Sequence, residues 1–119
     1  MSNQSPERIP ACATDDLTPG HPVRVLVSGP PVLVVRDEDG VIRAVDDTCT
    51  HAEISLADGF VEGQTVECWA HGARFGLVTG AALTPPASEP LRVRDVLVQN
   101  DIVYIGSTAQ VRARDRRGR

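Results

Sequence analysis

The sequence has no lysine, few aromatic residues and no long hydrophobic run. Aromatic residues make up 3% of the 119 residues, so small aliphatic side chains must fill the core of what we expect to be a single domain. No stretch reaches the roughly 18 consecutive apolar residues of a membrane-spanning helix. The first residues also lack the apolar segment of a secretion signal. We therefore expect a cytoplasmic protein that does not contact a membrane.

Basic and acidic residues are segregated along the chain, although the net charge is only −4. Residues 111–119 hold five Arg and one Asp, a net +4, whereas residues 1–110 hold seven Arg and fifteen Asp or Glu, a net −8. An acidic body argues against nucleic acid as a partner and favours a basic protein surface. We expect the basic end to be a disordered, solvated tail rather than a nucleic-acid-binding arm.

Short runs rich in Val, Ile and Leu alternate with turn residues, and helical periodicity is hard to find. This pattern predicts an all-β fold of the sandwich or barrel-like kind, without βαβ units. The proline-rich segment Leu83–Pro90 predicts a stiff surface loop. The strand-like runs are Pro22–Val27, Pro31–Arg36 and Val41–Val45, and further hairpins are expected around Glu62–Gly63, Thr79–Gly80 and Asn100–Asp101.

Two of the three cysteines and two of the three histidines fall into two short clusters. Cys49 and His51 form the first, and Cys68 and His71 the second. Each cluster follows a strand-like run, so two loops, each with one thiolate and one imidazole, could meet around a metal. In the cytoplasm such clusters favour metal over disulfide.

This mixed ligand set suits either zinc or iron. A structural zinc site normally pairs Cys with Cys and His with His along the chain. A two-iron cluster fits the spacing better, with Cys49 and Cys68 on one iron and His51 and His71 on the other. A zinc-stabilised interaction module remains an alternative at this point.

The motif Cys49-Thr-His51…Cys68-Trp-Ala-His71-Gly72 resembles the signature of Rieske proteins. The stretch from about Ile9 to Gly106 is similar to the small Rieske-type ferredoxins of aromatic-ring dioxygenase systems. The resemblance implies the all-β Rieske iron–sulfur fold, with stacked small antiparallel sheets and cluster-binding loops at the tip. It implies one [2Fe–2S] cluster per chain, held by Cys49, His51, Cys68 and His71. The expected organisation is a flexible N-terminus (1–8), the Rieske domain (9–107) and the basic disordered tail (108–119).

The same resemblance implies a one-electron carrier rather than an enzyme. Such a carrier passes electrons from a ferredoxin reductase to a terminal Rieske non-haem iron oxygenase, and meets both partners transiently. We expect a monomer that binds no nucleic acid. The alternative function is an accessory Rieske subunit linked to iron–sulfur assembly or to a nitrite reductase complex.

Four positions bear on the reduction potential that the resemblance implies. High-potential Rieske proteins carry a disulfide between the cluster loops, and its cysteines would fall at Ile54 and Ala70. They also carry Ser and Tyr hydroxyls that bond the cluster sulfurs, at the positions of Ala73 and Phe75. Since none of these features is present, the resemblance implies the low-potential ferredoxin type.

The remaining candidate residues have ordinary interpretations. We expect Cys12 to be a small buried residue and His21 a surface histidine. Trp69 either packs on the neighbouring sheet or shapes the exposed face from which electrons leave. Acidic residues around the first cluster are either solvated or form a docking rim for a partner; they are Asp46, Asp47, Glu53 and Asp58.

Overall fold

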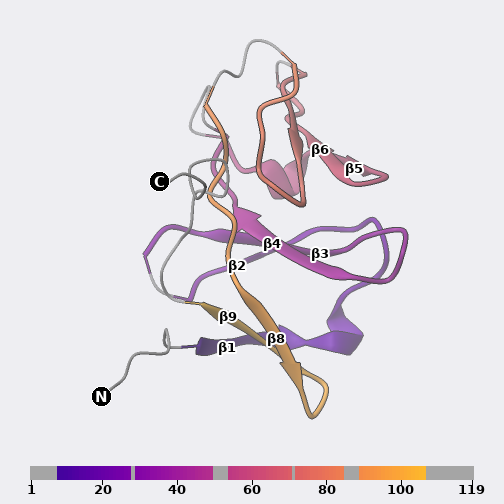
Figure 1. The fold of residues 1–119 in the computed structure, drawn as a ribbon, viewed down its shortest axis with the longest axis vertical. Helices are drawn as coiled ribbons and strands as arrows, with labels where there is room; N and C mark the ends of the chain where they lie inside the picture. The colour runs from indigo at the N-terminus through magenta and orange to yellow at the C-terminus, as the bar shows by residue number, and fades with distance from the viewer. Residues whose placement is uncertain (1–7, 28, 50–53, 71, 85–88, 107–119) are drawn as a thin grey trace, which may run out of the picture.

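The computed structural model describes residues 8–27, 29–49, 54–70, 72–84 and 89–106. This part of the chain forms nine short strands and two single 3₁₀ turns (Figure 1). The elements are β1 (Arg8–Ala13), η1 (Thr14–Asp16), β2 (Val23–Val25), β3 (Val32–Arg36), β4 (Ile42–Asp46), η2 (Leu56–Asp58), β5 (Phe60–Glu62), β6 (Thr65–Glu67), β7 (Arg74–Gly76), β8 (Val96–Gln99) and β9 (Ile102–Gly106). None of its helices is long and apolar enough to cross a membrane.

The strands form three antiparallel sheets of three strands each, in the orders β1-β9-β8, β2-β3-β4 and β5-β6-β7. Figure 1 shows them stacked, with β2-β3-β4 between the other two. We call the first two sheets the base and β5-β6-β7 the tip sheet. The predicted all-β fold of small stacked antiparallel sheets is therefore confirmed.

Strand β3 is buried on both faces and separates two hydrophobic cores. Residues Val32–Val35 are all buried, and successive side chains of a strand point to opposite faces. Val32 and Val34 join a core shared with β9, whereas Leu33 and Val35 join a core shared with the tip sheet. The continuous apolar run in β3 is thus explained by its place in the middle layer.

The hairpin of β3 and β4 was predicted, and a buried carboxylate shapes its turn. Asp37 is fully buried, and its Oδ1 accepts hydrogen bonds from the amides of Asp39 and Val41, both at 2.9 Å. Its Oδ2 accepts one from Arg43 at 3.2 Å. Burial alone would raise the pKa of Asp37, but these hydrogen bonds outweigh it and hold the pKa below its ordinary value.

Three other hairpins were predicted, and two are complete. Strands β5 and β6 pair across the turn at Gly63 and Gln64. Strands β8 and β9 join at Asn100 and Asp101, both with positive φ (55° and 65°), as a tight two-residue turn requires. The hairpin expected around Thr79–Gly80 is present but short. Its second arm pairs with β7 through one isolated bridge, Phe75 to Ala82, after a turn at residues 77–79.

Strand β1 was not predicted from the sequence. It pairs with β9 near the other end of the chain, and the register shifts between Pro10 and Cys12. That bulge breaks the alternation that marks a strand in sequence. Of the prolines in the expected surface loop, only Pro90 lies within the described residues, where it is half-buried.

Candidate metal centre

The structure brings Cys49 and Cys68 into one buried cluster between the base and the tip sheet. Cys49 comes three residues after the end of β4 and is 2% exposed, while Cys68 directly follows β6 and is fully buried. Both belong to the same core. His51 and His71 lie outside the described residues, and within the described ranges no group of three or more His, Cys, Asp and Glu could hold a metal ion.

The two cysteines begin loops that close in the same way. The Cys49 amide donates to the carbonyl oxygen of Ile54 at 3.0 Å, and the Cys68 amide donates to that of Ala73 at 2.8 Å. We call residues 49–54 the Cys49 loop and residues 68–73 the Cys68 loop. Each closing bond spans five residues, and each loop contains one of the predicted histidines.

A buried carboxylate lies beside the two ends of the Cys49 loop. We call the residues that flank this loop, Asp47–Thr48 and Ser55–Ala57, its neck. Asp47 is 1% exposed, and its Oδ1 accepts a hydrogen bond from the Ala57 amide at 2.8 Å. Its Oδ2 accepts a short hydrogen bond from the Ser55 hydroxyl and lies 3.2 Å from Nε of Arg24. Three donors on one buried carboxylate leave it neither solvated nor available to a docking partner.

The neighbouring carboxylate, Asp46, points to a different arginine. Its Oδ1 lies 3.2 Å from Nε of Arg94, which is 3% exposed and also donates to the carbonyl oxygen of Gly106 at 2.9 Å. Burial raises the pKa of Asp46, and the positive charge of Arg94 offsets this only in part. The expectation of a solvated or docking carboxylate is therefore corrected for Asp47, while Asp46 is half-buried and paired with Arg94.

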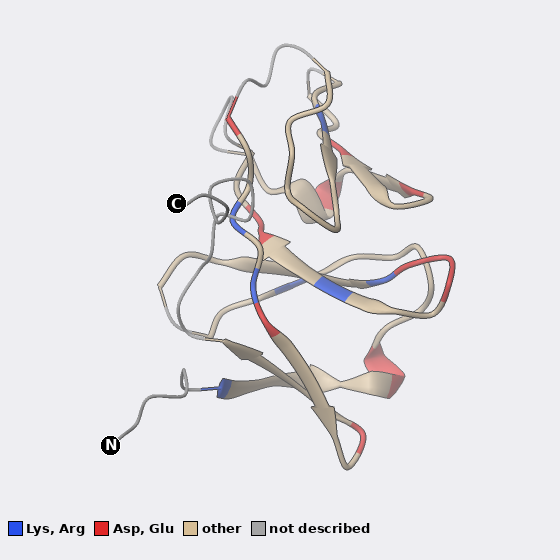
Figure 2. Cartoon of the chain, viewed as in Figure 1, with Lys and Arg blue, Asp and Glu red and all other residues tan. Residues whose placement is uncertain are grey.

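Exposed acidic residues lie elsewhere. Figure 2 shows them at η1, at the turn between β3 and β4, and at the end of β5. Asp58, the last residue of η2, is exposed as expected, and Glu53 lies outside the described residues. The exposed acidic residues are thus spread over the tip sheet and the base, and Asp58 lies close to the Cys49 loop.

The Cys68 loop is supported mainly by strands. It joins β6 to β7, which pair antiparallel, with Glu67 opposite Arg74 just outside the loop. These two side chains form an exposed ion pair, with 3.1 Å between Oε1 and Nε. Inside the loop, the Gly72 amide donates to the Cys68 carbonyl oxygen at 3.0 Å, and Gly72 has a φ of +75°, which favours glycine.

The interior around the cysteines is apolar. Ala73 and Phe75 are fully buried and contribute no side-chain donor. Trp69 is 53% exposed, which favours the second expectation, that it shapes the exposed face. The two buried thiols are soft ligands at the starts of matched loops, so the described residues fit a thiolate-bound metal cluster.

The third cysteine and the remaining histidine lie apart from these loops. Cys12 is half-buried in β1, and burial, followed by the negative charge of Asp16, raises the pKa of its thiol. This favours the protonated thiol, which is not the ligand form. His21 is exposed, as predicted.

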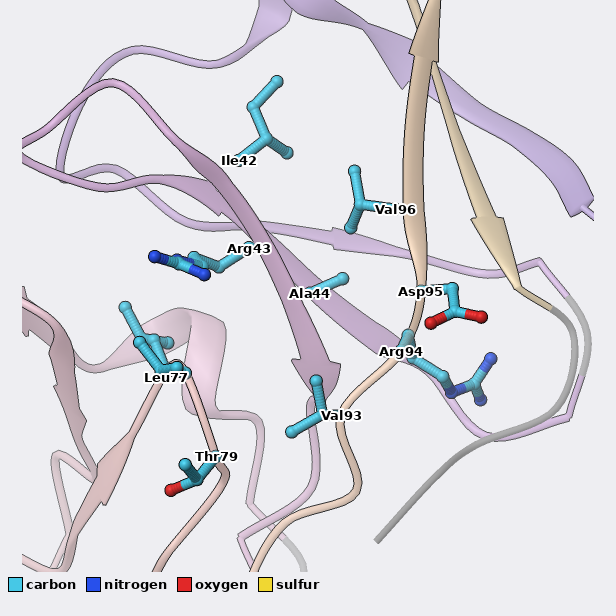
Figure 3. A pocket seen from close by; sticks show the side chains of 10 residues that line it. Ile42, Arg43, Ala44, Leu77, Thr79, Val93, Arg94, Asp95 and Val96 are labelled. Carbon is cyan, nitrogen blue, oxygen red and sulfur yellow. The ribbon is translucent and has the colours of Figure 1, made fainter. Parts of the chain in front are cut away.

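An open groove of about 540 Å³ lies between β4, the turn after β7 and the start of β8. Figure 3 shows that aliphatic side chains such as those of Ile42, Leu77 and Val96 surround it. Among the described residues, no Cys or His lines this groove. It is therefore separate from the predicted metal centre.

Comparison with known proteins identifies the family of this arrangement. A family model described as the Rieske [2Fe–2S] domain matches residues 7–99. The ferredoxin component of biphenyl 2,3-dioxygenase from Rhodococcus jostii (strain RHA1) is 38% identical over 94 residues, which cover 79% of this chain and 87% of that protein.

Solved structures agree with this similarity. A ferredoxin of Sphingomonas yanoikuyae B1 superposes with a TM-score of 0.78 at 30% identity, over 87% of this chain and 100% of that one. A chain from a complex of reduced oxygenase and oxidized ferredoxin in carbazole 1,9a-dioxygenase superposes with a TM-score of 0.79 at 36% identity, over 91% of this chain and 98% of that one.

Proposed function

The chain belongs to the Rieske [2Fe–2S] family, and from this premise we propose that it carries single electrons from a ferredoxin reductase to a Rieske non-haem iron oxygenase. It is a ferredoxin-type carrier with one [2Fe–2S] cluster. When bound, that cluster takes up and releases one electron. The proposal concerns the residues that hold the cluster and the proteins that exchange the electron.

We propose Cys49, His51, Cys68 and His71 as the ligands. The observation that carries this assignment is the pair of matched loops, each of which begins at a buried cysteine and closes five residues later. Burial keeps water away from both thiols, and the apolar side chains around them add no competing ligand. The spacing of the two histidines within these loops supports their role.

Metal analysis of single variants tests the ligand assignment. The anaerobically purified protein should be brown and contain equal amounts of iron and acid-labile sulfide. Cys49→Ser and Cys68→Ser should each lose the cluster, whereas Cys12→Ser, which changes the thiol in β1, should keep it. Zinc without iron in the wild-type protein would contradict the assignment.

The similarity to ferredoxin components of aromatic dioxygenase systems supports an oxygenase as the downstream partner. Reconstitution decides between this role and that of an accessory nitrite reductase or iron–sulfur assembly subunit. Reduced protein should support product formation by an aromatic-ring oxygenase. Failure with the oxygenase, together with electron delivery to a nitrite reductase, would favour the alternative.

We further propose that the protein is a cytoplasmic monomer with a Rieske domain at residues 9–107. Reduced thiols available for cluster binding are typical of the cytoplasm. The basic tail, residues 108–119, is proposed to be dispensable for cluster binding. A variant that ends at residue 107 should keep its iron content and sediment as a monomer.

A further inference from the structure

Asp47 has a role beyond solubility, because burial of its carboxylate is costly unless it is paired. Moving a carboxylate out of water costs several kcal/mol in proteins. Here the cost is offset by hydrogen bonds from the Ala57 amide and the Ser55 hydroxyl, and by the guanidinium of Arg24. These donors come from two parts of the chain, β2 and the segment that begins η2.

The backbone of Asp47 connects the same parts of the structure. Its amide donates to the carbonyl oxygen of Pro31 at 3.0 Å, just before β3, and its carbonyl oxygen accepts from the Leu56 amide at 2.7 Å. Arg24 belongs to β2, an outer strand of the middle sheet. Asp47 therefore ties the base to both ends of the segment that contains the Cys49 loop.

The Cys49 loop has little strand pairing to hold it. Its flanking residues, Thr48 and Ser55, form one isolated bridge, and η2 follows instead of a strand that pairs with β4. Side-chain contacts must supply the order that a ladder of hydrogen bonds gives elsewhere. Asp47 and its partners lie at this neck.

We propose that Asp47, together with Ser55 and Arg24, is a positioning unit that fixes the Cys49 loop and thereby the geometry of the iron–sulfur centre. This inference rests on the proposed function, because it assumes that the loop holds cluster ligands. Asp47 acts through the loop and does not touch the cluster. The protein remains a one-electron carrier under this proposal. The unit limits the range of positions that the ligands on the Cys49 loop can take.

The chemistry of the site requires a carboxylate. An ionised carboxylate only accepts hydrogen bonds, which matches three converging donors. In Asp47→Asn, the amide group would direct its own N–H bonds toward at least one of these donors. In Ser55→Ala, one donor is lost without any change of charge.

Ser55→Ala separates positioning from simple electrostatics. A change of nearby charge shifts a reduction potential even when the loop stays in place. Ser55→Ala leaves the charge unchanged, so an altered EPR spectrum of the reduced protein would report a changed cluster geometry. Thr65→Ala is the matched control, since its hydroxyl donates to the Glu62 carbonyl oxygen in an exposed turn of the tip sheet.

The experiment combines EPR spectra, cluster release to a chelator and hydrogen exchange at the Cys49 and Leu56 amides. We expect Ser55→Ala and Asp47→Asn to change the g-values and to release iron roughly tenfold faster, as loss of a hydrogen bond to a charged group predicts. Amide exchange at the neck should rise in the same variants. Thr65→Ala and the exposed-charge control Asp58→Asn should match the wild type in all three measurements.

Unchanged EPR spectra, iron release and neck exchange in Ser55→Ala would overturn the inference, even if Asp47→Asn does not fold. Failure of the proposed function looks different. A wild-type protein without iron and sulfide would contradict the carrier role. The amide exchange of Ser55→Ala against Thr65→Ala would still test whether the Asp47 unit holds the loop.

Discussion

The Cys49 loop and the Cys68 loop close with the same backbone hydrogen bond but are held by different means. The Cys68 loop connects two paired strands, β6 and β7, so the ladder fixes both of its ends. The Cys49 loop connects β4 to the 3₁₀ turn η2, and a buried carboxylate fixes its neck. The comparison teaches that side chains replace a missing ladder of hydrogen bonds where the Cys49 loop leaves its sheet.

The carboxylates of the ion pairs beside the two loops differ in how far they are buried. Both arginines are about half exposed, Arg24 at 49% and Arg74 at 46%, but Asp47 is 1% exposed whereas Glu67 is 34% exposed. Exposed pairs contribute roughly 0–1 kcal/mol, because water and salt screen them. Changing Asp47 costs more, since the Ala57 amide and the Ser55 hydroxyl beside it would lose a buried charged acceptor.

The largest expected loss of stability comes from changing the buried carboxylate of Asp47. Asp47→Asn should lower the free energy of unfolding by about 3 kcal/mol, because the hydrogen bonds from the Ala57 amide and the Ser55 hydroxyl lose their charged acceptor. Glu67→Gln, the matching change beside the Cys68 loop, should cost about 0.5 kcal/mol. Anaerobic urea denaturation measures both, and equal losses would show that the two necks are held alike.

A second prediction concerns two glycines near these loops. Gly59 ends η2, and a Cβ atom there would overlap the Glu67 carbonyl oxygen. At Gly72 a Cβ atom would lie 3.7 Å from Oε2 of Glu67, which is an ordinary contact. Only the positive φ of Gly72 disfavours a side chain there.

Gly59→Ala should therefore cost about 3 kcal/mol of unfolding free energy, and Gly72→Ala about 1–2 kcal/mol. Thermal unfolding of the two variants in parallel checks the order. A smaller loss in Gly59→Ala than in Gly72→Ala would mean that η2 and β6 separate easily.

Hydroxyl groups added beside the Cys68 loop should raise the reduction potential. Ala73→Ser and Phe75→Tyr place donors where high-potential relatives carry them, and hydrogen bonds to the cluster sulfurs favour the reduced state. For a one-electron couple, about 59 mV corresponds to a tenfold change. We expect each variant to raise the potential by tens of millivolts, up to about 100 mV.

Protein-film voltammetry measures these potentials. Ala44→Ser is the matched control, because Ala44 is a buried alanine in the base. The absence of an upward shift in variants with intact clusters would mean that burial and overall charge set the potential.

The smallest expected effect is on the rate of association with a partner, when exposed carboxylates around the loops are neutralised. Asp58 and Glu89 are exposed, and their attraction to a basic partner is screened over about 8 Å at physiological ionic strength. Neutralising either should slow association with the reductase a few-fold at low salt and leave dissociation unchanged. Stopped-flow rates that do not depend on salt would argue against electrostatic docking.

Much of the fold was predictable because its hairpins are local. The Asp37–Gly40 and Asn100–Asp101 turns carry their own signals, so the strands on either side followed from alternation. Strand β1 was missed because its partner, β9, lies at the opposite end of the chain and Pro10 precedes a bulge. The proposed ligand motif could be read from the sequence because its spacing is itself the signal, and the structure describes only its two cysteines.

The role of Asp47 could not be predicted from sequence. Two adjacent aspartates are typical of a solvated surface in sequence. The partner of Asp47 is Arg24, 23 residues away, and the partner of Asp46 is Arg94, 48 residues away. Asp46 is the last residue of β4 and Asp47 lies in the bend that follows, and each carboxylate meets its own arginine. Only the tertiary structure brings these groups together.

The most direct test of the account is pulsed EPR of the reduced protein labelled with ¹⁵N-histidine. The chain has three histidines, and the account predicts two strongly coupled nitrogens, from His51 and His71. Both couplings should persist in the control His21→Ala, whereas His51→Ala and His71→Ala should each abolish the two-nitrogen spectrum. A spectrum with fewer than two coupled nitrogens, or one altered by His21→Ala, would contradict the account.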